Sequence, residues 1–323
     1  MTDFFIVEEI QKMIKGLPKP RLFFKKGVSV RGYFRPYMSL KDYTKAALFI
    51  DQNEVTPVTV RFSSMLGDIG TADTRRNIKC MAVKFHSYGE VYDMICQNIP
   101  VLMTNDINDL SKAADTYRTR AYFDGINRKR FWEYISDHNA SITFALMLYS
   151  HMGLADSFVD INMFSVNTYL MKTNDSHKCM VRFKWVPISE KLNRNADPDK
   201  VITVNTAEFI AGYDPDRAVN EIISRILTKR FPMYELHVQM IPVSKAGNKK
   251  YTDRTLLWSE NEAPYMCVGM MVLDQIDDGR IDDPELYFLP ANTVEGIEVY
   301  LDEMSQIYDF LLRSEAMERG AEL

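Results

Sequence analysis

The 323-residue sequence predicts an α+β fold in one domain with a short N-terminal arm. Segments with the alternation of half-buried strands occur in two groups. One group lies before and the other after a helical stretch at residues 107–153, and a further helical stretch closes the chain. Strands gathered in groups, with helices between and after them, are typical of an α+β fold and not of regular strand–helix alternation.

The composition excludes several classes of protein. Lys plus Arg number 39 and Asp plus Glu 44, so the formal net charge of −5 offers no basic footprint for nucleic acid. No apolar run approaches the roughly 20 residues that cross a bilayer, and the first residues lack the basic start of a signal peptide. The four scattered cysteines do not make a disulfide framework. We therefore expect a reduced, cytoplasmic protein that binds neither nucleic acid nor membrane.

Residues 1–20 are expected to form the arm, and residues 21–323 the main domain. Apolar residues in the arm have helical spacing and favour a packing face. Gly16 and Pro18 end that helical pattern.

Strands are expected from about Val55 onward. Val58, Val60 and Phe62 alternate with polar residues, as one buried face of a strand requires. A hairpin is predicted over residues 80–96, with its turn at 87–90. Later strands are predicted at 162–171, 177–186, 234–243 and 265–274, two helices around an acidic turn at 207–231, and a helix over the tail at 301–312.

Short catalytic motifs are missing from the sequence, which has no Walker-type glycine loop, GxSxG, HExxH or CxxC. The five histidines are scattered, and a lone histidine on a strand, such as His237, is expected to be structural. Cys80 and Cys96 lie on opposite arms of the predicted hairpin, where two small buried residues are favoured over a redox pair. We predict no metal site.

Longer stretches resemble the heme catalases. Residues 56–85 (TPVTVRFSSMLGDIGTADTRRNIKCMAVKF) are similar to the family's TPIAVRFS strand, GSADTxR turn and GFAVKF strand. NIPVLMTND at 98–106 is similar to the NNTPIFFIRD segment, and GIEVYLDEM at 296–304 to GIExSxDKM. The stretches at 207–240 and 268–274 also match in the same order, so the likeness extends from about Arg21 to Arg319.

This resemblance implies a closed antiparallel β-barrel with inserted helices at about 50–275. A wrapping segment and a terminal helix follow at about 276–323. The length resembles the minimal, single-domain members of the family, which lack an additional C-terminal domain. Catalases are commonly oligomers with interlocked arms, so a homo-oligomer is expected, and the short arm is compatible with a dimer.

The resemblance also locates the family's distal heme residues. The distal histidine, an acid–base group, is replaced by Phe24, and the serine that supports it matches Ser63. The distal asparagine becomes Gln97, and the asparagine after it is retained as Asn98. Two phenylalanines of the family become leucines, Leu102 and Leu110.

The proximal residues differ as well. The axial tyrosine of the family becomes Leu312, and the arginine one turn earlier becomes Tyr308. Leucine cannot ligate ferric heme, and phenylalanine at the distal position cannot carry a proton. Three arginines that hold heme propionates in the family match Arg21, Arg61 and Arg319.

Two interpretations of the changed positions stay open. Phe24, Leu102 and Leu312 could fill an unused cavity, or they could wall a pocket converted to an organic ligand. Tyr308 could ligate heme from one turn earlier, about 5.4 Å along the helix axis, but a packed tyrosine is favoured. Buried arginines require anionic partners. Either Arg21 and Arg61 pair with internal Asp or Glu, or they hold the carboxylates of a ligand, which suit a guanidinium. The second interpretation is preferred, and it points to a small acidic molecule.

Three functional hypotheses follow. In the first, no heme is expected, and an enzyme of specialised metabolism binds a small acidic organic molecule in the former heme pocket. Arg61 and Arg21 clamp the carboxylate, Gln97 and Asn98 add polar contacts, and Tyr308 donates a proton. In the second, heme is kept on a non-family ligand such as Tyr308 for peroxidase or hydroperoxide chemistry. In the third, the protein is a non-catalytic binding or assembly module.

Overall fold

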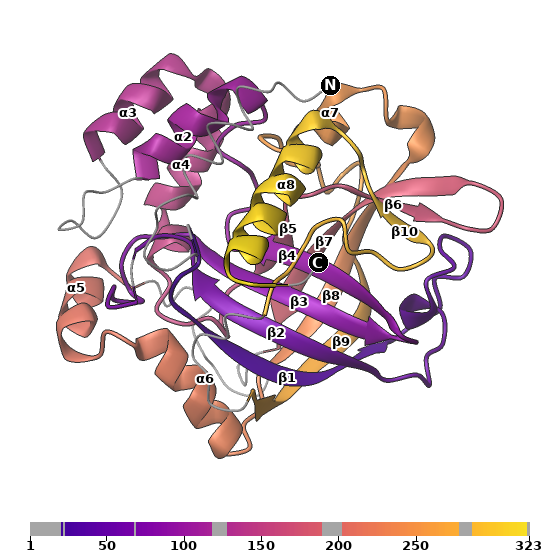
Figure 1. The fold of residues 1–323 in the computed structure, drawn as a ribbon, viewed down its shortest axis with the longest axis horizontal. Helices are drawn as coiled ribbons and strands as arrows, with labels where there is room; N and C mark the ends of the chain where they lie inside the picture. Colours follow the sequence, from indigo (N-terminus) through magenta and orange to yellow (C-terminus); the bar gives the residue numbers. More distant parts are fainter. Residues whose placement is uncertain are drawn as a thin grey trace.

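The computed structural model describes residues 21, 23–67, 69–117, 128–188, 202–277 and 286–321. The predicted arm at 1–20 lies outside these residues. The α+β prediction is confirmed, and Figure 1 shows strands wrapped into a barrel with helices around it.

All strand pairs are antiparallel. The pairing of β7 with β8 closes a ring that runs β7-β5-β4-β3-β2-β1-β9-β8, and β6 and β10 extend the sheet beyond it. Closure leaves these ring strands without the open edges that promote aggregation. The strands are β1 (Gly27–Pro36), β2 (Thr56–Ser64), β3 (Lys79–Ser87), β4 (Glu90–Gln97), β5 (Met163–Ser165), β6 (Tyr169–Lys172), β7 (His177–Pro187), β8 (Met233–Pro242), β9 (Met266–Ile276) and β10 (Ile297–Val299).

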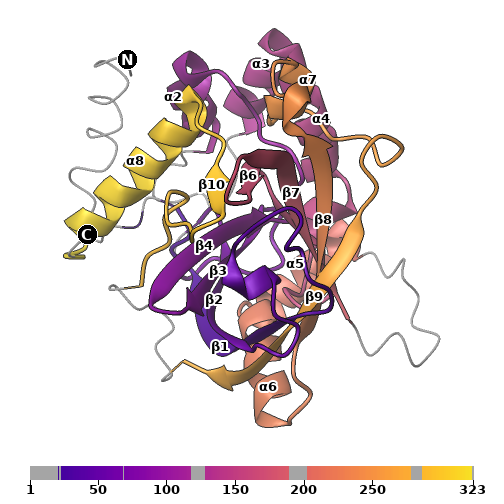
Figure 2. The same ribbon diagram turned by 90° about the vertical axis from the view of Figure 1, so that its right-hand side faces the viewer.

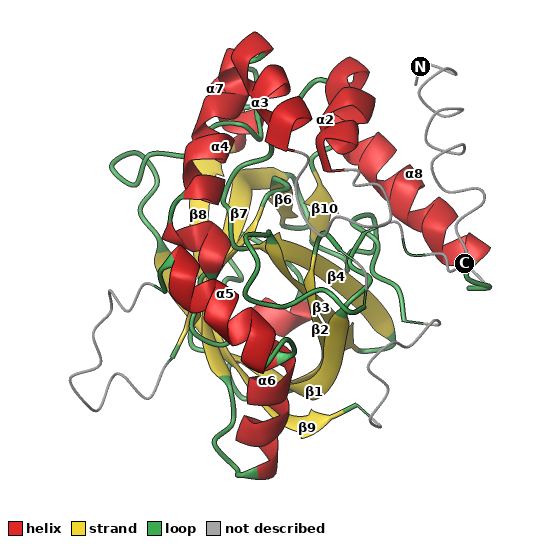
Figure 3. Ribbon diagram, turned by 90° about the vertical axis from the view of Figure 1, so that its left-hand side faces the viewer, coloured by secondary structure: helices red, strands yellow, loops and turns green. Residues whose placement is uncertain are grey.

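The helices lie outside the barrel, as Figure 3 shows. The predicted helical stretch at 107–153 contains α2, α3 and α4, and its residues 118–127 lie outside the described part. The α-helices are α2 (Leu110–Tyr117), α3 (Arg128–Asp137), α4 (Ile142–Tyr149), α5 (Val204–Tyr213), α6 (Arg217–Leu227), α7 (Lys249–Thr252) and α8 (Glu303–Glu318). Short 3₁₀ turns occur at η1 (Ala47–Phe49), η2 (Ile107–Asp109), η3 (Asn139–Ser141), η4 (His151–Leu154) and η6 (Val243–Lys245). Among the described residues, no helix is long and apolar enough to span a membrane.

Strand β1 corrects the sequence prediction, which placed the first strand near Val55 and the barrel from about residue 50. β1 begins at Gly27 and pairs with both β2 and β9, so the barrel depends on it. Gly32 interrupts its apolar alternation. A Cβ on Gly32 would lie 1.9 Å from the carbonyl oxygen of Val272, at the β1–β9 register shift. Glycine is therefore required at this position, because the backbones of β1 and β9 approach each other closely.

The barrel interior is packed with aromatic rings. Phe34, Phe85 and Trp185 are fully buried, and their ring centroids lie 5.5–6.3 Å apart. Val58, Val60 and Phe62 also face this core, which confirms the predicted alternation in β2. The alternate residues of β2 are buried too, because other elements cover the outer face of the sheet.

Helix α8 and the segment before it provide that cover. Figures 1 and 2 show α8 lying along the outside of the barrel beside β4 and β10. Asp93 on β4 anchors the segment, since its Oδ2 accepts hydrogen bonds from the Leu289 N–H at 2.9 Å and the Asn292 side chain at 2.8 Å. Lys84 pairs with the same carboxylate at 2.6 Å. The wrapping segment expected from the family resemblance is therefore present.

The start of α8 is held by an ion pair between the buried Arg254 and the half-buried Asp302. Arg254 is 1% exposed and donates two hydrogen bonds to Asp302, at 2.6 and 2.9 Å. Asp302 is also the N-cap, and its carboxylate accepts from the N–H of Ser305 at 2.8 Å. Burial raises the pKa of Asp302, but the hydrogen bonds and charge of Arg254 outweigh it, and the net shift is downward. The carboxylate therefore stabilises the fold above its unfolded pKa, and this contribution is lost as the pH falls below about 4.

We predict that Asp302→Ala lowers the free energy of unfolding by about 3–5 kcal/mol, because it leaves the Arg254 charge buried without its partner. Urea denaturation at pH 7 is the measurement. Glu133→Ala is the matched control. Its pair with Lys129 spans 3.8 Å between exposed side chains, so a change below about 0.5 kcal/mol is expected. Equal effects of the two substitutions would contradict the assigned role of Asp302.

Candidate functional site

The register of three neighbouring strands builds one wall of the site. Arg61 on β2 pairs with Ala82 on β3, and Ala82 pairs with Ile95 on β4. The next row on the same face is Ser63, Cys80 and Gln97. Directly paired residues point to the same side of a sheet, so both rows face outward from the barrel core.

Helix α8 forms the opposite wall. Its cavity-lining residues recur at helical spacing, which places them along one face of the helix. They are Met304, Tyr308, Leu311, Leu312, Glu315 and, at the C-cap, Arg319. Helix α2 adds Leu110 and its neighbours, and the chain before β1 adds Phe24.

Between these walls lie two adjoining cavities. The larger, of about 160 Å³, is lined mainly by apolar side chains. The smaller, of about 50 Å³, is lined by three arginines and other polar groups together with apolar side chains. The two cavities adjoin because they share five lining residues, namely Phe24, Cys80, Ile95, Tyr308 and Leu312.

The charged side chains that line the smaller cavity are mainly cationic among the described residues. Arg21, Arg61 and Arg319 all line it together with Glu315, so these four side chains carry an excess of two positive charges. Arg21 and Arg319 both donate to the carbonyl oxygen of Leu286, at 3.0 and 3.3 Å. Arg61 and Glu315 are only 3% and 4% exposed. Three residues far apart in the sequence thus place their guanidinium groups around one space.

Phe24 has an unusual backbone. Its φ is 61°, in the left-handed region that a bulky side chain rarely adopts. Its N–H donates to the carbonyl oxygen of Met65 at 3.0 Å, and its ring lies edge to face with that of Phe23. Such a conformation costs on the order of 1–3 kcal/mol and persists where the surroundings enforce it. The ring of Phe24 is therefore held at the junction of the two cavities.

Tyr308 also lines both cavities. Within the described part of the chain its hydroxyl makes no hydrogen bond, which leaves it available to a ligand. Burial, and then the nearby Cys80 and Glu315, raise the pKa of Tyr308. Burial likewise raises the pKa of the Cys80 and Cys96 thiols. All three groups are consequently protonated and neutral near pH 7.

The two predicted amide residues behave differently. Gln97 lines the larger cavity, and its Nε2 donates to the carbonyl oxygens of Ile99 at 2.7 Å and Val101 at 3.1 Å. Its Oε1 is therefore the atom that remains for a ligand. Asn98 is not among the residues that line either cavity, because its amide holds the backbone of Lys79 and Met152 at 2.9 and 2.5 Å.

The structure brings the other predicted site residues together. Besides Gln97, Phe24, Tyr308 and the three arginines, these are Ser63, Leu102, Leu110 and Leu312. Sequence reasoning missed Glu315, although it continues the spacing of Met304, Tyr308 and Leu311 along the tail helix. It also missed Tyr287 and Phe288 of the wrapping segment, which no local pattern marks.

A closed antiparallel barrel with a helix-covered cavity on its outer face defines the class of fold. The model of the family described as Catalase matches residues 1–320, and the chain belongs to the catalase family. The resemblance seen in the sequence is thereby confirmed.

The similar proteins are catalases from distant organisms. The catalase of Drosophila melanogaster is 28% identical over 308 residues, which cover 94% of this chain and 59% of the relative. The catalase of Methanosarcina barkeri is 28% identical over 312 residues, with 95% and 60% covered. A fungal catalase crystal structure has a TM-score of 0.84 at 22% identity, covering 98% of this chain and 63% of that one, and this likeness supports the fold. The chain spans about three-fifths of the length of the Drosophila and Methanosarcina relatives.

We predict that Tyr308→Phe changes the free energy of unfolding by less than about 1 kcal/mol, because the removed hydroxyl has no partner to lose. The control is Tyr234→Phe. The buried Tyr234 hydroxyl donates to the carbonyl oxygen of Phe158 at 2.9 Å, so its removal should cost about 1–3 kcal/mol. Urea denaturation compares the two variants. A loss in Tyr308→Phe as large as that in Tyr234→Phe would mean that the Tyr308 hydroxyl has a structural role.

Proposed function

We propose that this catalase-family chain binds a small, amphipathic organic acid in the two adjoining cavities and acts on it without heme. The observation that carries the proposal is the continuity of an apolar cavity with a cationic one. A carboxylate suits the arginine end, since guanidinium groups bind carboxylates through paired hydrogen bonds. The hydrocarbon part of the same molecule would occupy the apolar end.

The lining residues do not fit the heme of the family. Phe24 and Leu312 match the distal and axial positions that the resemblance assigns, and no histidine is among the described residues that line the cavities. Glu315 lines only the smaller cavity. Tyr308 and the thiols of Cys80 and Cys96 are the other anionic donors, and burial favours the neutral forms of these three. Ligation of ferric iron by tyrosine or cysteine uses the deprotonated side chain, and the nearby Glu315 further opposes a phenolate at Tyr308.

The same residues suit an organic acid. The neutral Tyr308 hydroxyl is a proton donor at the junction of the cavities, next to the carboxylate expected at the arginines. Gln97 offers an acceptor oxygen in the larger cavity, with its own donors already used. Phe24, Leu102, Leu110 and Leu312 exclude water from the hydrocarbon part. In this proposal Tyr308 is the catalytic acid, and Arg61 orients the substrate.

We predict that the protein, expressed with added heme precursor and purified, carries no stoichiometric heme. The absorption spectrum is the measurement. A Soret band equivalent to one heme per chain would contradict the proposal, and its loss in Tyr308→Phe would then favour a heme protein with Tyr308 as ligand. Oxygen evolution from peroxide should also be negligible, since loss of a general acid–base group alone costs about 10²–10⁴-fold.

We further predict that decanoate binds more tightly than methyl decanoate, and that Arg61→Ala weakens decanoate binding roughly 10- to 150-fold. This corresponds to about 1.5–3 kcal/mol for a lost charge-assisted hydrogen bond. Isothermal titration calorimetry measures both ligands. Arg31→Ala on β1 is the matched control and should leave decanoate binding unchanged, since Arg31 pairs with Asp277 at 2.7 Å and does not line the cavities. If Arg61→Ala instead unfolds the protein and neither probe binds the parent chain, a non-catalytic structural module is the better description.

A further inference from the structure

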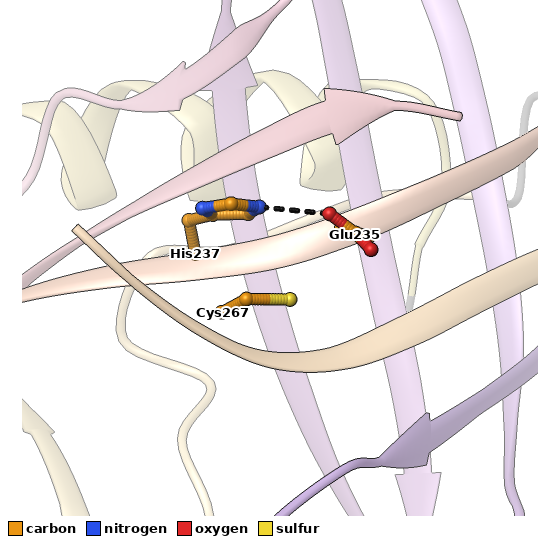
Figure 4. Close-up of side chains that lie close together, drawn as sticks. All are labelled: Glu235, His237 and Cys267. Atoms are coloured by element: carbon orange, nitrogen blue, oxygen red, sulfur yellow. Dashed lines mark hydrogen bonds and ion pairs between the residues drawn. The ribbon is translucent and has the colours of Figure 1, made fainter. Parts of the chain in front are cut away.

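A second group of potential ligands lies on the other side of the barrel. Glu235 and His237 on β8 and Cys267 on β9 gather their ligand atoms within 4.8 Å of one another. Figure 4 shows the three side chains side by side, with the imidazole directed at the carboxylate. In the described part of the chain, no other group of three such side chains comes this close. None of the three lines the cavities discussed above.

A register shift creates this arrangement. Leu236 pairs with Gly269, but the next residue, His237, pairs with Cys267, so Val268 has no partner on β8. Without this bulge His237 would face Val268, and Cys267 would point toward the core. The extra residue turns Cys267 to the outer face, where Glu235 and His237 also lie because they are two residues apart. Val268 is itself fully buried in the barrel core.

The distances suit a tetrahedral cation. Nε2 of His237 lies 3.1 Å from Oε2 of Glu235. Two nitrogen or oxygen ligands bound at about 2.1 Å to tetrahedral Zn²⁺ lie about 3.4 Å apart, so only a small adjustment is needed. The side chains are 21% and 34% exposed for His237 and Glu235. A cation can therefore enter from solvent and keep water as a fourth ligand.

The charges also fit. A thiolate, a carboxylate and a neutral imidazole together carry a formal charge of −2, which neutralises a divalent cation and so favours its binding in a partly buried site. Without a cation, burial and the charge of Glu235 raise the pKa of the Cys267 thiol to about 11. The cysteine is therefore a poor nucleophile as it stands. Lys184 on β7 pairs with His237 on β8, but its ammonium group lies over the rings of Phe164 and Tyr265, at 5.5 and 4.8 Å from their centroids.

We propose that Glu235, His237 and Cys267 form a binding site for one Zn²⁺ ion, with an open fourth position. Zn²⁺ is favoured among divalent cations because it accepts mixed sulfur, nitrogen and oxygen ligands in a tetrahedral arrangement. The ion would link β8 to β9 beside the bulge. This site is independent of the cavity and of the function proposed for it.

The test uses Co²⁺ as a spectroscopic probe on the full chain, after treatment with a chelator and in the presence of a phosphine reductant. We expect one Co²⁺ per chain with a thiolate-to-cobalt charge-transfer band, which Zn²⁺ then abolishes by displacement. Cys267→Ser should remove the band. Both Cys267→Ser and His237→Gln should weaken Zn²⁺ binding by more than about 100-fold, which exceeds the loss expected when a residue that only hydrogen-bonds a metal ligand is replaced. Zn²⁺ should raise the thermal midpoint of the parent chain and not of these variants.

His177→Gln is the matched control. His177 pairs with Glu298 at 2.6 Å on β7 and β10, so it is a similar histidine–carboxylate pair outside the proposed site. This variant should bind Co²⁺ like the parent chain. The proposal is overturned if the parent chain shows no charge-transfer band, or if the band persists in Cys267→Ser. If Cys267→Ser fails to fold, His237→Gln alone decides, since unchanged affinity in that variant also overturns the site.

Discussion

The pairing register of β2, β3 and β4 is the constraint on which the cavity depends. It places Arg61, Ala82 and Ile95 in one row and Ser63, Cys80 and Gln97 in the next. A slip of one residue would turn these side chains into the core and bring the apolar residues of the interior outward. The closed barrel resists such a slip, because β1 must pair with both β2 and β9.

Helix α8 turns this sheet face into an enclosed site. The ion pair between Arg254 and Asp302 holds the start of the helix, and the bonds of Asp93 hold the segment before it. Enclosure has an electrostatic consequence, since burial keeps Tyr308 and the thiols neutral. The guanidinium groups of Arg21, Arg61 and Arg319 line only the smaller of the two cavities. Helix α8 thus encloses both a mainly apolar cavity and a smaller cavity that contains the arginines.

The outer surface of β8 and β9 follows the same rules of register. A single extra residue at Val268 brings Cys267 to the side of Glu235 and His237. Bulges commonly redirect a side chain in this way. The two candidate sites therefore share a physical origin, because in each the distance between functional groups is set by which residues pair across strands. They differ in charge, since the cavity has an excess of cations and the surface group offers anionic ligands.

The sequence by itself determined the strands after Val55, the hairpin at 80–96 and the tail helix, because apolar period and turn residues are local signals. Family resemblance added Phe24, Tyr308, Leu312 and the three arginines as neighbours. Tertiary structure decided what depends on pairing between distant segments. It bonded the Asn98 amide to the backbone of Lys79 and Met152 and brought Glu315 to the arginines. It also placed Cys267 beside His237. No local pattern encodes these contacts, because strand register and helix docking are set by the packing of the whole barrel.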